Sequence, residues 1–427
     1  MKQLLLIPSL LLSLHAATDL YTVDTLIEKA LLSSPDLNIS RSSVEIAEQQ
    51  TKQAVSDYLP QIDLYGGIGQ TGIKTDGSQE KSRLLTGQVT ASQLIYDFGK
   101  TGGQIDYYAE ESDASYARYN QEISNKIYNV KKDYYDLLRK ESLIRVYEEN
   151  LALTQQQLIR AERYFTAGIK TKIDVADAKV RLIQAQLDLE NSHYDRKLAY
   201  VTLDRSVGNI RQTVEGQLYL PDLNITGDLY GSLPKESMSL DALVDFAYRQ
   251  RFELKSYEHR IRSAQNKVRQ ESGDFYPGLY LGGNYQYSDV ESDIQAYVPE
   301  QQWSANVNLK WNIFGGLRTV ARTQQAKLAL LQSRSSYDDA KLRIRQEATD
   351  AGISLLKRLA NVKLSQELSE AAREKFEQAQ KRYENGLSDY IELQEARQGY
   401  INANAALVSN YYDYYIALAA LERAIGR

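Results

Sequence analysis

Two pairs of acidic residues follow the predicted turns of this chain, at points where helices are expected to begin. They are Asp174 and Asp177 in the first half, and Glu392 and Glu395 in the second. Residues three apart share a helix face, so each pair presents two carboxylates in one direction. Repeated around a symmetry axis, such pairs would form acidic rings that favour cations in a pore. Alternatively, acidic residues in a first turn stabilise the helix N-terminus, and both interpretations stay open for Asp174 and Asp177.

Other patterns with possible chemistry are weaker. The segment Gly67 to Gly72 has the spacing of a dinucleotide-binding turn, but that motif needs a following helix, and a polar loop and a strand are predicted there. His193 and His259 have no companions at metal-ligand spacing, and we expect them at surface or interhelix positions. The absence of Cys excludes disulfides and thiol nucleophiles. We therefore expect no enzyme activity, no catalytic residues, no metal site and no cofactor.

The composition favours an exported, predominantly helical protein. The 427 residues include 51 Lys+Arg, 56 Asp+Glu and only seven Pro, and the mildly negative balance argues against a nucleic-acid partner. Residues 1–17 combine a positive end, an apolar stretch and small residues, as is typical of a signal peptide. No other apolar run approaches the roughly 20 residues of a transmembrane helix. Any part within a membrane is therefore expected to consist of strands.

The chain is expected to contain two copies of one unit, residues 18–208 and 236–427, joined by a linker at 209–235. Matching motifs recur at a constant separation of about 218 residues, which indicates a tandem duplication. The matching positions include Asp57–Pro60 with Asp274–Pro277, Gly168 with Gly386, and Ile173–Val175 with Ile391–Leu393.

Each copy is predicted to contain a helix, a β-hairpin, a long helix and a return helix. The last three are expected at about 60–96, 102–165 and 172–207, and again at about 277–314, 317–384 and 390–426. At 1.5 Å per residue, each long helix would span roughly 95 Å. Apolar residues recur every seven positions along the first long helix, which predicts supercoiling against partner helices. They are Ile123, Val130, Leu137, Ile144, Leu151 and Leu158.

The hairpins carry the membrane signal. Apolar and polar residues alternate without interruption from Trp303 to Ile313, the period and length of a tilted membrane strand. The first-half strands alternate less regularly, and polar loops are expected at 74–83 and 288–301. The alternative is a half-buried hairpin of a soluble protein. Four strands cannot close a barrel, and open edges are excluded from lipid. Since a barrel of about eight strands fills with its own side chains, a duct needs at least three chains.

The Pro-led strands, the strand-to-helix junctions at Tyr96–Gly99 and Phe314–Gly316, and the turns after Tyr164 and Tyr383 resemble the TolC family of outer membrane efflux proteins. The resemblance covers nearly the whole chain after residue 17. It implies an α+β membrane protein, a homotrimer whose twelve-stranded outer-membrane β-barrel (four strands per chain) continues as a long α-helical barrel in the periplasm of a Gram-negative cell. It also implies three partners: a periplasmic adaptor, an inner-membrane pump of RND, ABC or MFS type, and outer membrane lipid.

The resemblance also assigns roles near the turns. Gly168 and Gly386 mark the tips expected to contact the adaptor. Glu392 and Glu395 align with the acids of the family's periplasmic constriction, which favours the ring interpretation for that pair.

Two further residues match positions that hold the family's gate closed. These are Asp174 and Tyr383, whereas an Arg expected as a further latch is replaced by Ser388. How tightly this gate closes is left open by that replacement.

The expected function is an exit duct of a tripartite efflux pump or type I secretion system. A barrel-anchored structural or adhesive coiled-coil trimer is the alternative. The sequence does not separate small-molecule efflux from polypeptide secretion, nor does it identify the pump or adaptor. The tyrosines of 411–415 are expected to pack between helices, with their hydroxyls reaching water.

Overall fold

The computed structural model describes residues 22–75, 78–208, 233, 239–292 and 300–427. The predicted signal peptide at 1–17 and almost all of the predicted linker at 209–235 lie outside these residues. The described residues form two compact units, which we describe separately. One unit combines 36–124, 240–349 and 424–427, and the other combines 1–35, 125–239 and 350–423 within the described ranges.

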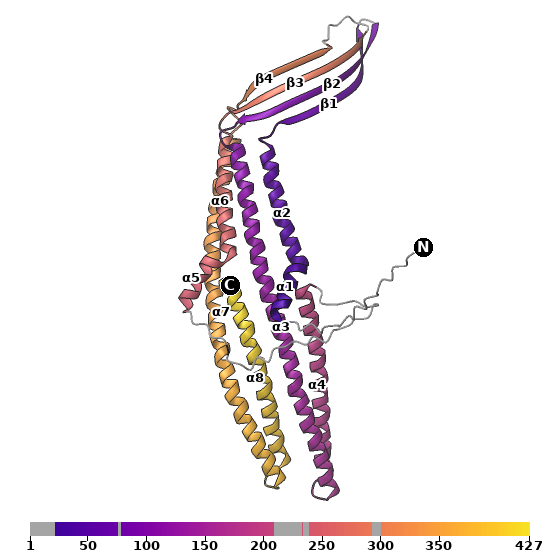
Figure 1. Ribbon diagram of the computed structural model, residues 1–427, viewed down its shortest axis with the longest axis vertical. Helices are drawn as coiled ribbons and strands as arrows, with labels where there is room; N and C mark the ends of the chain where they lie inside the picture. The colour runs from indigo at the N-terminus through magenta and orange to yellow at the C-terminus, as the bar shows by residue number, and fades with distance from the viewer. Residues whose placement is uncertain (1–21, 76–77, 209–232, 234–238, 293–299) are drawn as a thin grey trace, which may run out of the picture. The chain divides into compact units, whose positions relative to one another are not determined.

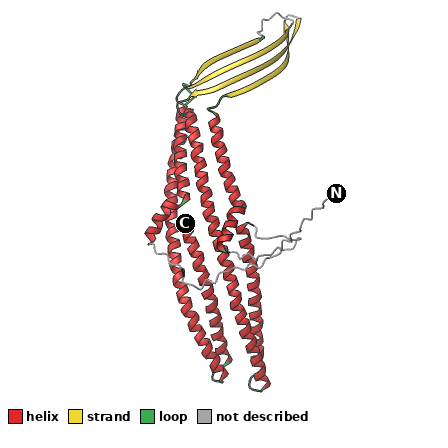
Figure 2. Cartoon of the chain, viewed as in Figure 1, coloured by secondary structure: helices red, strands yellow, loops and turns green. Residues whose placement is uncertain are grey.

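The first of these units contains a single antiparallel sheet, coloured yellow in Figure 2. Its strands follow the order β1-β2-β3-β4, so the second strand of the first hairpin pairs with the first strand of the second hairpin. The strands are β1 (Gln61–Thr75), β2 (Ser78–Tyr96), β3 (Gly278–Ser292) and β4 (Gln301–Lys310).

The sheet has one apolar and one polar face. Neighbouring strands place Leu64, Val89, Tyr285 and Trp303 in one row across the sheet. The adjacent row consists of Asp63, Thr90, Asn284 and Ser304. Because successive side chains of a strand point to opposite faces, these two rows lie on opposite sides.

Three details of the hairpins differ from the sequence prediction. The loop predicted at 288–301 begins too early, because β3 continues to Ser292 and pairs with β2 there. The loop predicted at 74–83 is wrong, because β1 and β2 stay paired up to Thr75 and Ser78. Backbone pairing does not require apolar side chains, so polar residues continue the ladder there. β4 also ends at Lys310 rather than near Ile313. Its last pair is with Gly278, which follows Pro277, and proline has no N–H group with which to extend the ladder.

The same unit contains five helical segments (Figure 1). They are α2 (Pro35–Ser56), the first part of α3 (Lys100–Thr166), α5 (Leu240–Gln250), α6 (Phe252–Gly273) and the first part of α7 (Arg318–Glu384). Left-handed backbone marks both strand-to-helix junctions, with φ of 53° at Phe98 and 64° at Leu317. This conformation costs a bulky residue about 1–2 kcal/mol, so the surrounding structure must impose it.

The second unit contains α1 (Val23–Ser33), the remainder of α3, α4 (Lys172–Val207), the remainder of α7, and α8 (Tyr390–Ile425). Figure 1 shows α4 returning beside α3 and α8 returning beside α7. The seven-residue pattern lies in the core, where Val130, Leu137 and Ile144 are all buried. The pattern of apolar residues therefore marks the helix interfaces.

The tyrosine-rich run belongs to this core. Tyr411, Tyr412 and Tyr414 are buried, and the ring of Tyr415 lies 5.2 Å from that of Tyr135 on α3. The prediction that these rings pack between helices is confirmed. The prediction that the hydroxyls reach water is wrong for Tyr412, because its hydroxyl lies 2.8 Å from the Oγ of Ser142.

Candidate functional site

The turn from α3 to α4 and the turn from α7 to α8 have the same backbone. Gly168 and Gly386 have φ angles of 75° and 71°, a conformation that glycine adopts without a Cβ penalty. A Cβ added to either residue would meet no atom within 4 Å. The backbone conformation, rather than a lack of space, therefore explains glycine at the two predicted tips.

Matching hydrogen bonds cap the C-terminal ends of α3 and α7. The N–H of Ile169 donates to the carbonyl of Tyr164 (2.9 Å), and the N–H of Leu387 donates to the carbonyl of Arg382 (2.8 Å). Such bonds satisfy carbonyls that a helix C-terminus leaves without partners. They also turn the side chains of Ile169 and Leu387 outward, where these are 67% and 69% exposed. Each tip thus presents an aliphatic side chain to solvent.

The helices that follow the turns are capped in related ways. Thr171 Oγ1 accepts from the N–H of Asp174 (3.4 Å), and Asp174 Oδ2 accepts from the N–H of Thr171 (2.8 Å), forming a capping box. These hydrogen bonds, first that from the backbone of Thr171, hold the pKa of Asp174 below its ordinary value. In the second turn Asp389 Oδ1 accepts from the N–H of Glu392 (2.8 Å). Asp174 is therefore the partner of Thr171, the N-cap residue of α4, in the capping box.

The charges around the two turns differ. Ile173 and Ile391 are matched exposed residues in the first turns of α4 and α8. At two neighbouring positions the first turn has a lysine and the second turn has an uncharged side chain. At a third position the second turn has a carboxylate and the first turn has a hydroxyl. The differing positions are Lys170 against Ser388, Lys172 against Tyr390, and Thr171 against Asp389.

Tyr383, predicted like Asp174 to help hold the gate closed, lies at the end of α7. It is 7% exposed, and its ring lies 6.0 Å from that of Tyr390 and 5.2 Å from the ammonium of Lys170. Burial raises the pKa of Tyr383, and the negative charge of Asp174 raises it further. The structure thus brings the two predicted gate residues close enough to interact electrostatically.

The remaining predicted acids lie on accessible surface. Glu392 is partly exposed, and Glu395 and Asp177 are exposed. Arg382, near the end of α7, contacts Glu392 (Nη1–Oε1, 3.2 Å), and both side chains are more than one-third exposed. Each acidic pair therefore reaches solvent beside its turn, and Glu392 is already paired with a cation across the α7–α8 hairpin.

A second ion pair, unlike the first, joins the α3–α4 hairpin to the α7–α8 hairpin. The sequence did not identify this contact. Arg160 on α3 contacts Glu384 at the end of α7 (2.7 Å), and Gln380 donates to the same Oε1 atom over 3.0 Å. The hydrogen bond from Gln380 and the pairing with Arg160 lower the pKa of Glu384. The partners are 224 residues apart, so no local spacing could have indicated the contact.

A polar layer lies above the second turn. Arg397 on α8 is 3% exposed, and its Nη1 donates to Asn150 Oδ1 on α3 over 3.4 Å. Burial lowers the pKa of Arg397 and raises that of Tyr390 to about 12. Gln394 on α8 bonds Gln157 on α3 (2.8 Å). These contacts tie the second hairpin to the first along their length, in addition to the pair at the tips.

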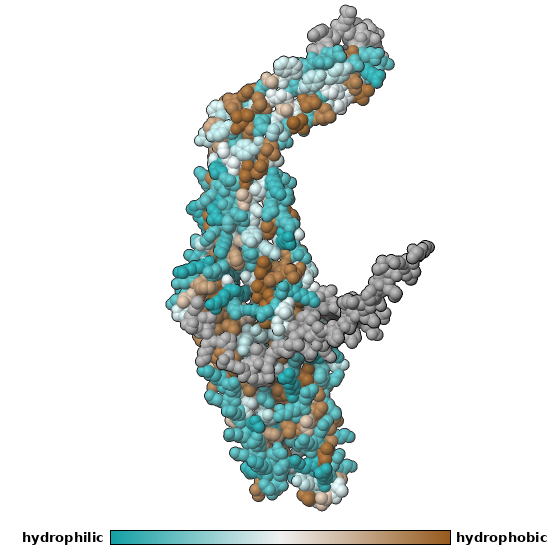
Figure 3. All heavy atoms as spheres, in the orientation of Figure 1, coloured by the Kyte–Doolittle hydropathy of each residue, from teal (hydrophilic) through white to brown (hydrophobic). Residues whose placement is uncertain are grey.

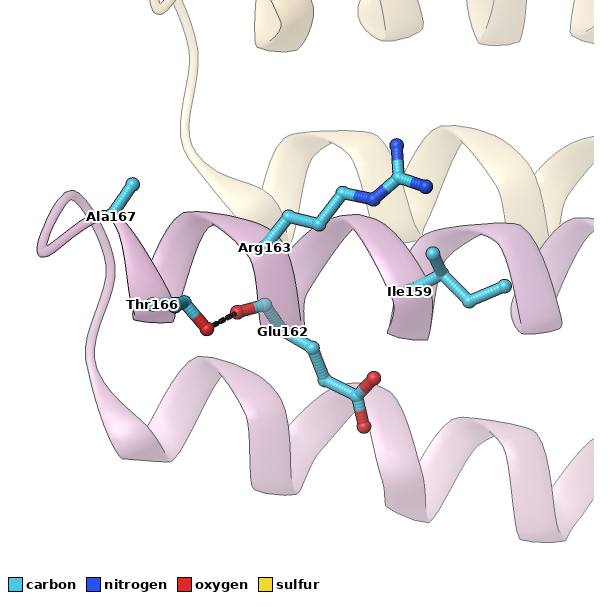
Figure 4. Close-up of a pocket in the computed structure, with 5 residues that line it drawn as sticks. All are labelled: Ile159, Glu162, Arg163, Thr166 and Ala167. Carbon is cyan, nitrogen blue, oxygen red and sulfur yellow. Dashed lines mark hydrogen bonds between the residues drawn. The ribbon is translucent and has the colours of Figure 1, made fainter.

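A shallow pocket of about 480 Å³ lies along the last turns of α3. Figure 4 shows its lining residues, with Glu162 and Arg163 projecting in different directions and the hydroxyl of Thr166 donating to the carbonyl of Glu162. Ile159 and Ala167 complete the lining. The pocket ends one residue before Gly168 and so adjoins the first tip.

Apolar side chains also remain exposed away from the turns, as the brown patches on the mainly teal helices illustrate (Figure 3). In the unit that contains the turns they follow α4 and α7. They include Val180, Ile183, Leu187 and Leu198 on α4, and Ile353, Leu356, Leu364 and Leu368 on α7, each at least half exposed. No helix in the described part of the chain combines the length and apolar character needed to cross a membrane.

Comparison with known proteins gives a consistent result. The family model described as "Outer membrane efflux protein" matches residues 26–209 and again 243–427. The outer membrane efflux protein BepC of Brucella suis biovar 1 is 23% identical over 399 residues, covering 93% of this chain and 84% of BepC. The alkaline protease secretion protein AprF of Pseudomonas aeruginosa is 26% identical over 280 residues, covering 65% of this chain and 55% of AprF.

Solved structures share the fold. The CmeC outer membrane channel of Campylobacter jejuni superimposes with a TM-score of 0.82 at 17% identity, covering 95% of this chain and 85% of that one. The outer membrane protein VceC of Vibrio cholerae gives a TM-score of 0.79 at 17% identity, covering 95% and 96%. The mostly helical fold, with two repeats and one small sheet, is therefore confirmed.

Proposed function

The chain belongs to the outer membrane efflux protein family, and we propose that three copies of it form an exit duct through the outer membrane. Each copy contributes four strands to a twelve-stranded barrel and two helical hairpins to a periplasmic helical barrel. As a member of this family the chain is an outer-membrane protein. The family and the relatives compared are channel and secretion proteins rather than enzymes.

The two-faced sheet with two edge strands carries this proposal. β1 and β4 each pair on one edge only within the described sheet, and unpaired strand edges are not tolerated in lipid. Side chains of the apolar row are strongly exposed, with Leu64 at 79% and Trp303 at 77%. Joining β1 of one copy to β4 of the next pairs both edges, turns the apolar face to lipid, and leaves the polar face to line an aqueous passage.

The exposed apolar side chains of α4 and α7 support the same assembly. Isolated exposed apolar residues are ordinary on soluble surfaces, but these follow one another along α4 and α7 at spacings of three, four, eight and eleven residues, which keep them near one face of each helix. Burying them against helices of neighbouring copies removes a continuous apolar surface from water. A single copy would leave that surface exposed.

Glu392 and Glu395 are proposed to form the constriction of the duct. In three copies they would contribute six carboxylates at the second tips, and closely spaced like charges of this kind attract cations and repel anions. Asp174 and Asp177 would contribute less, because Asp174 is committed to the cap with Thr171. This assignment rests on the solvent-accessible positions of the two carboxylates and on the resemblance of Glu392 and Glu395 to the acids of the family's periplasmic constriction.

The gate is proposed to be held closed by ion pairs and by Tyr383 packed near Asp174. The Arg160–Glu384 pair joins the two hairpins of one chain, and the Arg382–Glu392 pair lies within the second hairpin. The family resemblance leads us to expect a latching arginine at the position of Ser388. In its absence, these two ion pairs would supply the charged contacts. Opening would then separate the hairpins at their tips, where breaking the first pair removes the charged contact between them.

The tips at Gly168 and Gly386 are proposed to meet a periplasmic adaptor, and through it an inner-membrane pump. Their exposed aliphatic side chains, with the shallow pocket beside the first, offer small apolar contacts surrounded by charge. Both small molecules and polypeptides remain candidates for the cargo, because the relatives include efflux proteins and a protein named for protease secretion.

Electrical recording tests the duct directly. The purified protein in planar lipid bilayers should give discrete, long-lived conductance steps with a preference for K⁺ over Cl⁻, and single-particle mass measurement in detergent should give three chains. Absence of conductance from protein that is demonstrably trimeric would favour the adhesive or structural alternative. A monomer in detergent that retains its helical content would contradict the assembly itself.

A further inference from the structure

A histidine and two carboxylates meet between α3 and α6, well away from the turns. His259 Nδ1 lies 2.7 Å from Glu110 Oε2 and 3.6 Å from Asp113 Oδ2. All three ligand atoms lie within 4.8 Å of one another. Sequence spacing gave His259 no companions because Glu110 and Asp113 belong to a helix about 150 residues earlier. Folding therefore creates a group that the sequence did not indicate.

The group has the composition and spacing of a zinc site. Bonds of about 2.0–2.2 Å from zinc to imidazole and carboxylate place ligand atoms about 3.4 Å apart in a tetrahedral site. The two measured separations from Nδ1, 2.7 and 3.6 Å, lie on either side of that value. Glu110 and Asp113 are three residues apart on α3 and so share a helix face. His259 and Glu110 are each about one-quarter exposed, whereas Asp113 is open to solvent, leaving room for a water ligand.

Arg262 now occupies the place of a cation in this group. Its Nε lies 2.9 Å from Glu110 Oε2, and its Nη2 lies 2.7 Å from His259 Nδ1. The side chain is 45% exposed, so it can leave the group without disturbing the core.

Arg262 can only donate hydrogen bonds to this group. His259 Nδ1 and Glu110 Oε2 lie 2.7 Å apart, and a metal ion bound to both atoms would accept a lone pair from each.

We propose that Glu110, Asp113 and His259 form a zinc site that joins α3 to α6, and that Arg262 fills this site when no metal is bound. One imidazole with two carboxylates suits a borderline ion such as Zn²⁺ better than Mg²⁺ or Ca²⁺, which prefer oxygen ligands alone. Zinc would displace Arg262 into solvent and clamp the two helices together. The proposal depends neither on the gate nor on the nature of the cargo.

The alternative is an ordinary interhelix ion-pair network, and a neighbouring pair provides a matched control for it. Arg269 on α6 is one heptad beyond Arg262, and it pairs with Asp106 on α3 in the same way. No histidine is found with that pair in the described part of the chain. Removing Arg269 therefore removes a comparable α3–α6 ion pair without freeing a ligand set.

The test is titration of tag-free, chelator-treated full-length protein with Zn²⁺ by calorimetry, comparing Arg262→Met with Arg269→Met. We expect Arg262→Met to bind one zinc per chain at least about tenfold more tightly than Arg269→Met, because it removes the competing cation. Adding His259→Ala to Arg262→Met should abolish this binding. Co²⁺ added to Arg262→Met should give the visible absorption bands of a four-coordinate site, which nonspecific surface carboxylates do not produce.

Thermal melting separates the site from a folding defect. Zinc should raise the melting temperature of Arg262→Met and leave that of the double variant unchanged. Equal zinc affinity for Arg262→Met and Arg269→Met, or binding that survives His259→Ala, would overturn the proposal and leave an ion-pair network.

Discussion

The turn between α3 and α4 and the turn between α7 and α8 have matching glycines, matching closing hydrogen bonds and matching exposed aliphatic residues. Their charges do not match. The first turn carries Lys170 and Lys172, whereas the second carries Asp389 at its cap and pairs Glu392 with Arg382. The positions that fix the backbone and the exposed aliphatic positions have matching residue types in the two repeats, whereas the charged positions differ. Shape is therefore common to the two turns, and any difference in their roles must come from charge.

The strongest contrast is expected between the two acidic pairs. Replacing both Glu392 and Glu395 with Gln should weaken block of the channel by divalent cations about tenfold or more, because two carboxylates per chain leave the constriction. The matched replacement of Asp174 and Asp177 with Asn should change block much less. Planar-bilayer recordings with Mg²⁺ titrated on the tip side measure both. Equal effects of the two double variants would remove the distinction between the turns.

The shared backbone predicts equal sensitivity to alanine. Gly168→Ala and Gly386→Ala should each destabilise the folded chain by about 1–2 kcal/mol, because each forces a side chain into left-handed backbone. Gly399→Ala is a suitable control, since Gly399 lies inside α8 with open space around it, and alanine should stabilise a helix interior. Thermal melting of the three variants gives the comparison. Loss of stability at only one turn would show that the turns differ in more than charge.

The capping box should be sensitive to acid. Thr171→Ala should lower the free energy of unfolding by about 1 kcal/mol, a typical value for the loss of an N-cap. Because folding lowers the pKa of Asp174, its stabilising contribution is present above the ordinary aspartate pKa and is lost as the pH falls through the lowered value. Melting curves between pH 2 and pH 7 should therefore differ between wild type and Asp174→Asn mainly at the upper end of that range. A constant difference across the whole range would contradict this explanation.

The smallest effect is expected for the ion pair that joins the two turns. Arg160 and Glu384 are about one-third exposed or more, so breaking the pair should cost less than about 1 kcal/mol per chain. The lowered pKa of Glu384 means that the pair persists above the ordinary glutamate pKa and is lost below the lowered value. Wild-type channels should therefore open more often in acid, and Glu384→Gln channels should open more often even at neutral pH.

A local pair on α7 provides the control for this experiment. Arg373 and Glu377 form an ion pair within the helix (3.0 Å), so Glu377→Gln removes a carboxylate without uncoupling the hairpins. Single-channel open probability should change in Glu384→Gln alone. If both variants open alike, the pair between the turns does not restrain the gate.

The repeated architecture could be predicted from the sequence because it depends on local patterns. Alternation from Trp303 onward predicted a strand, the matching glycines at 168 and 386 predicted the two turns, and the seven-residue period predicted the buried residues Val130 and Leu137. The end of β4 could not be predicted in this way, since it depends on where its partner strand begins, at Gly278.

The contacts that distinguish the two turns could not be predicted. Arg160 and Glu384 are separated by 224 residues, and each resembles any other charged residue near a helix end. The same holds for His259, whose carboxylate neighbours come from another helix. Spacing along one helix indicates which residues share a face, but not which face of which other helix they meet. For these sites the tertiary packing was required.

The proposed trimer encloses a continuous passage. Electron microscopy of the protein extracted from outer membranes in detergent tests this most directly. We predict a hollow particle with threefold symmetry, with a detergent belt around the sheet end and an open lumen through the helices. A solid rod, or a particle without threefold symmetry, would contradict the duct.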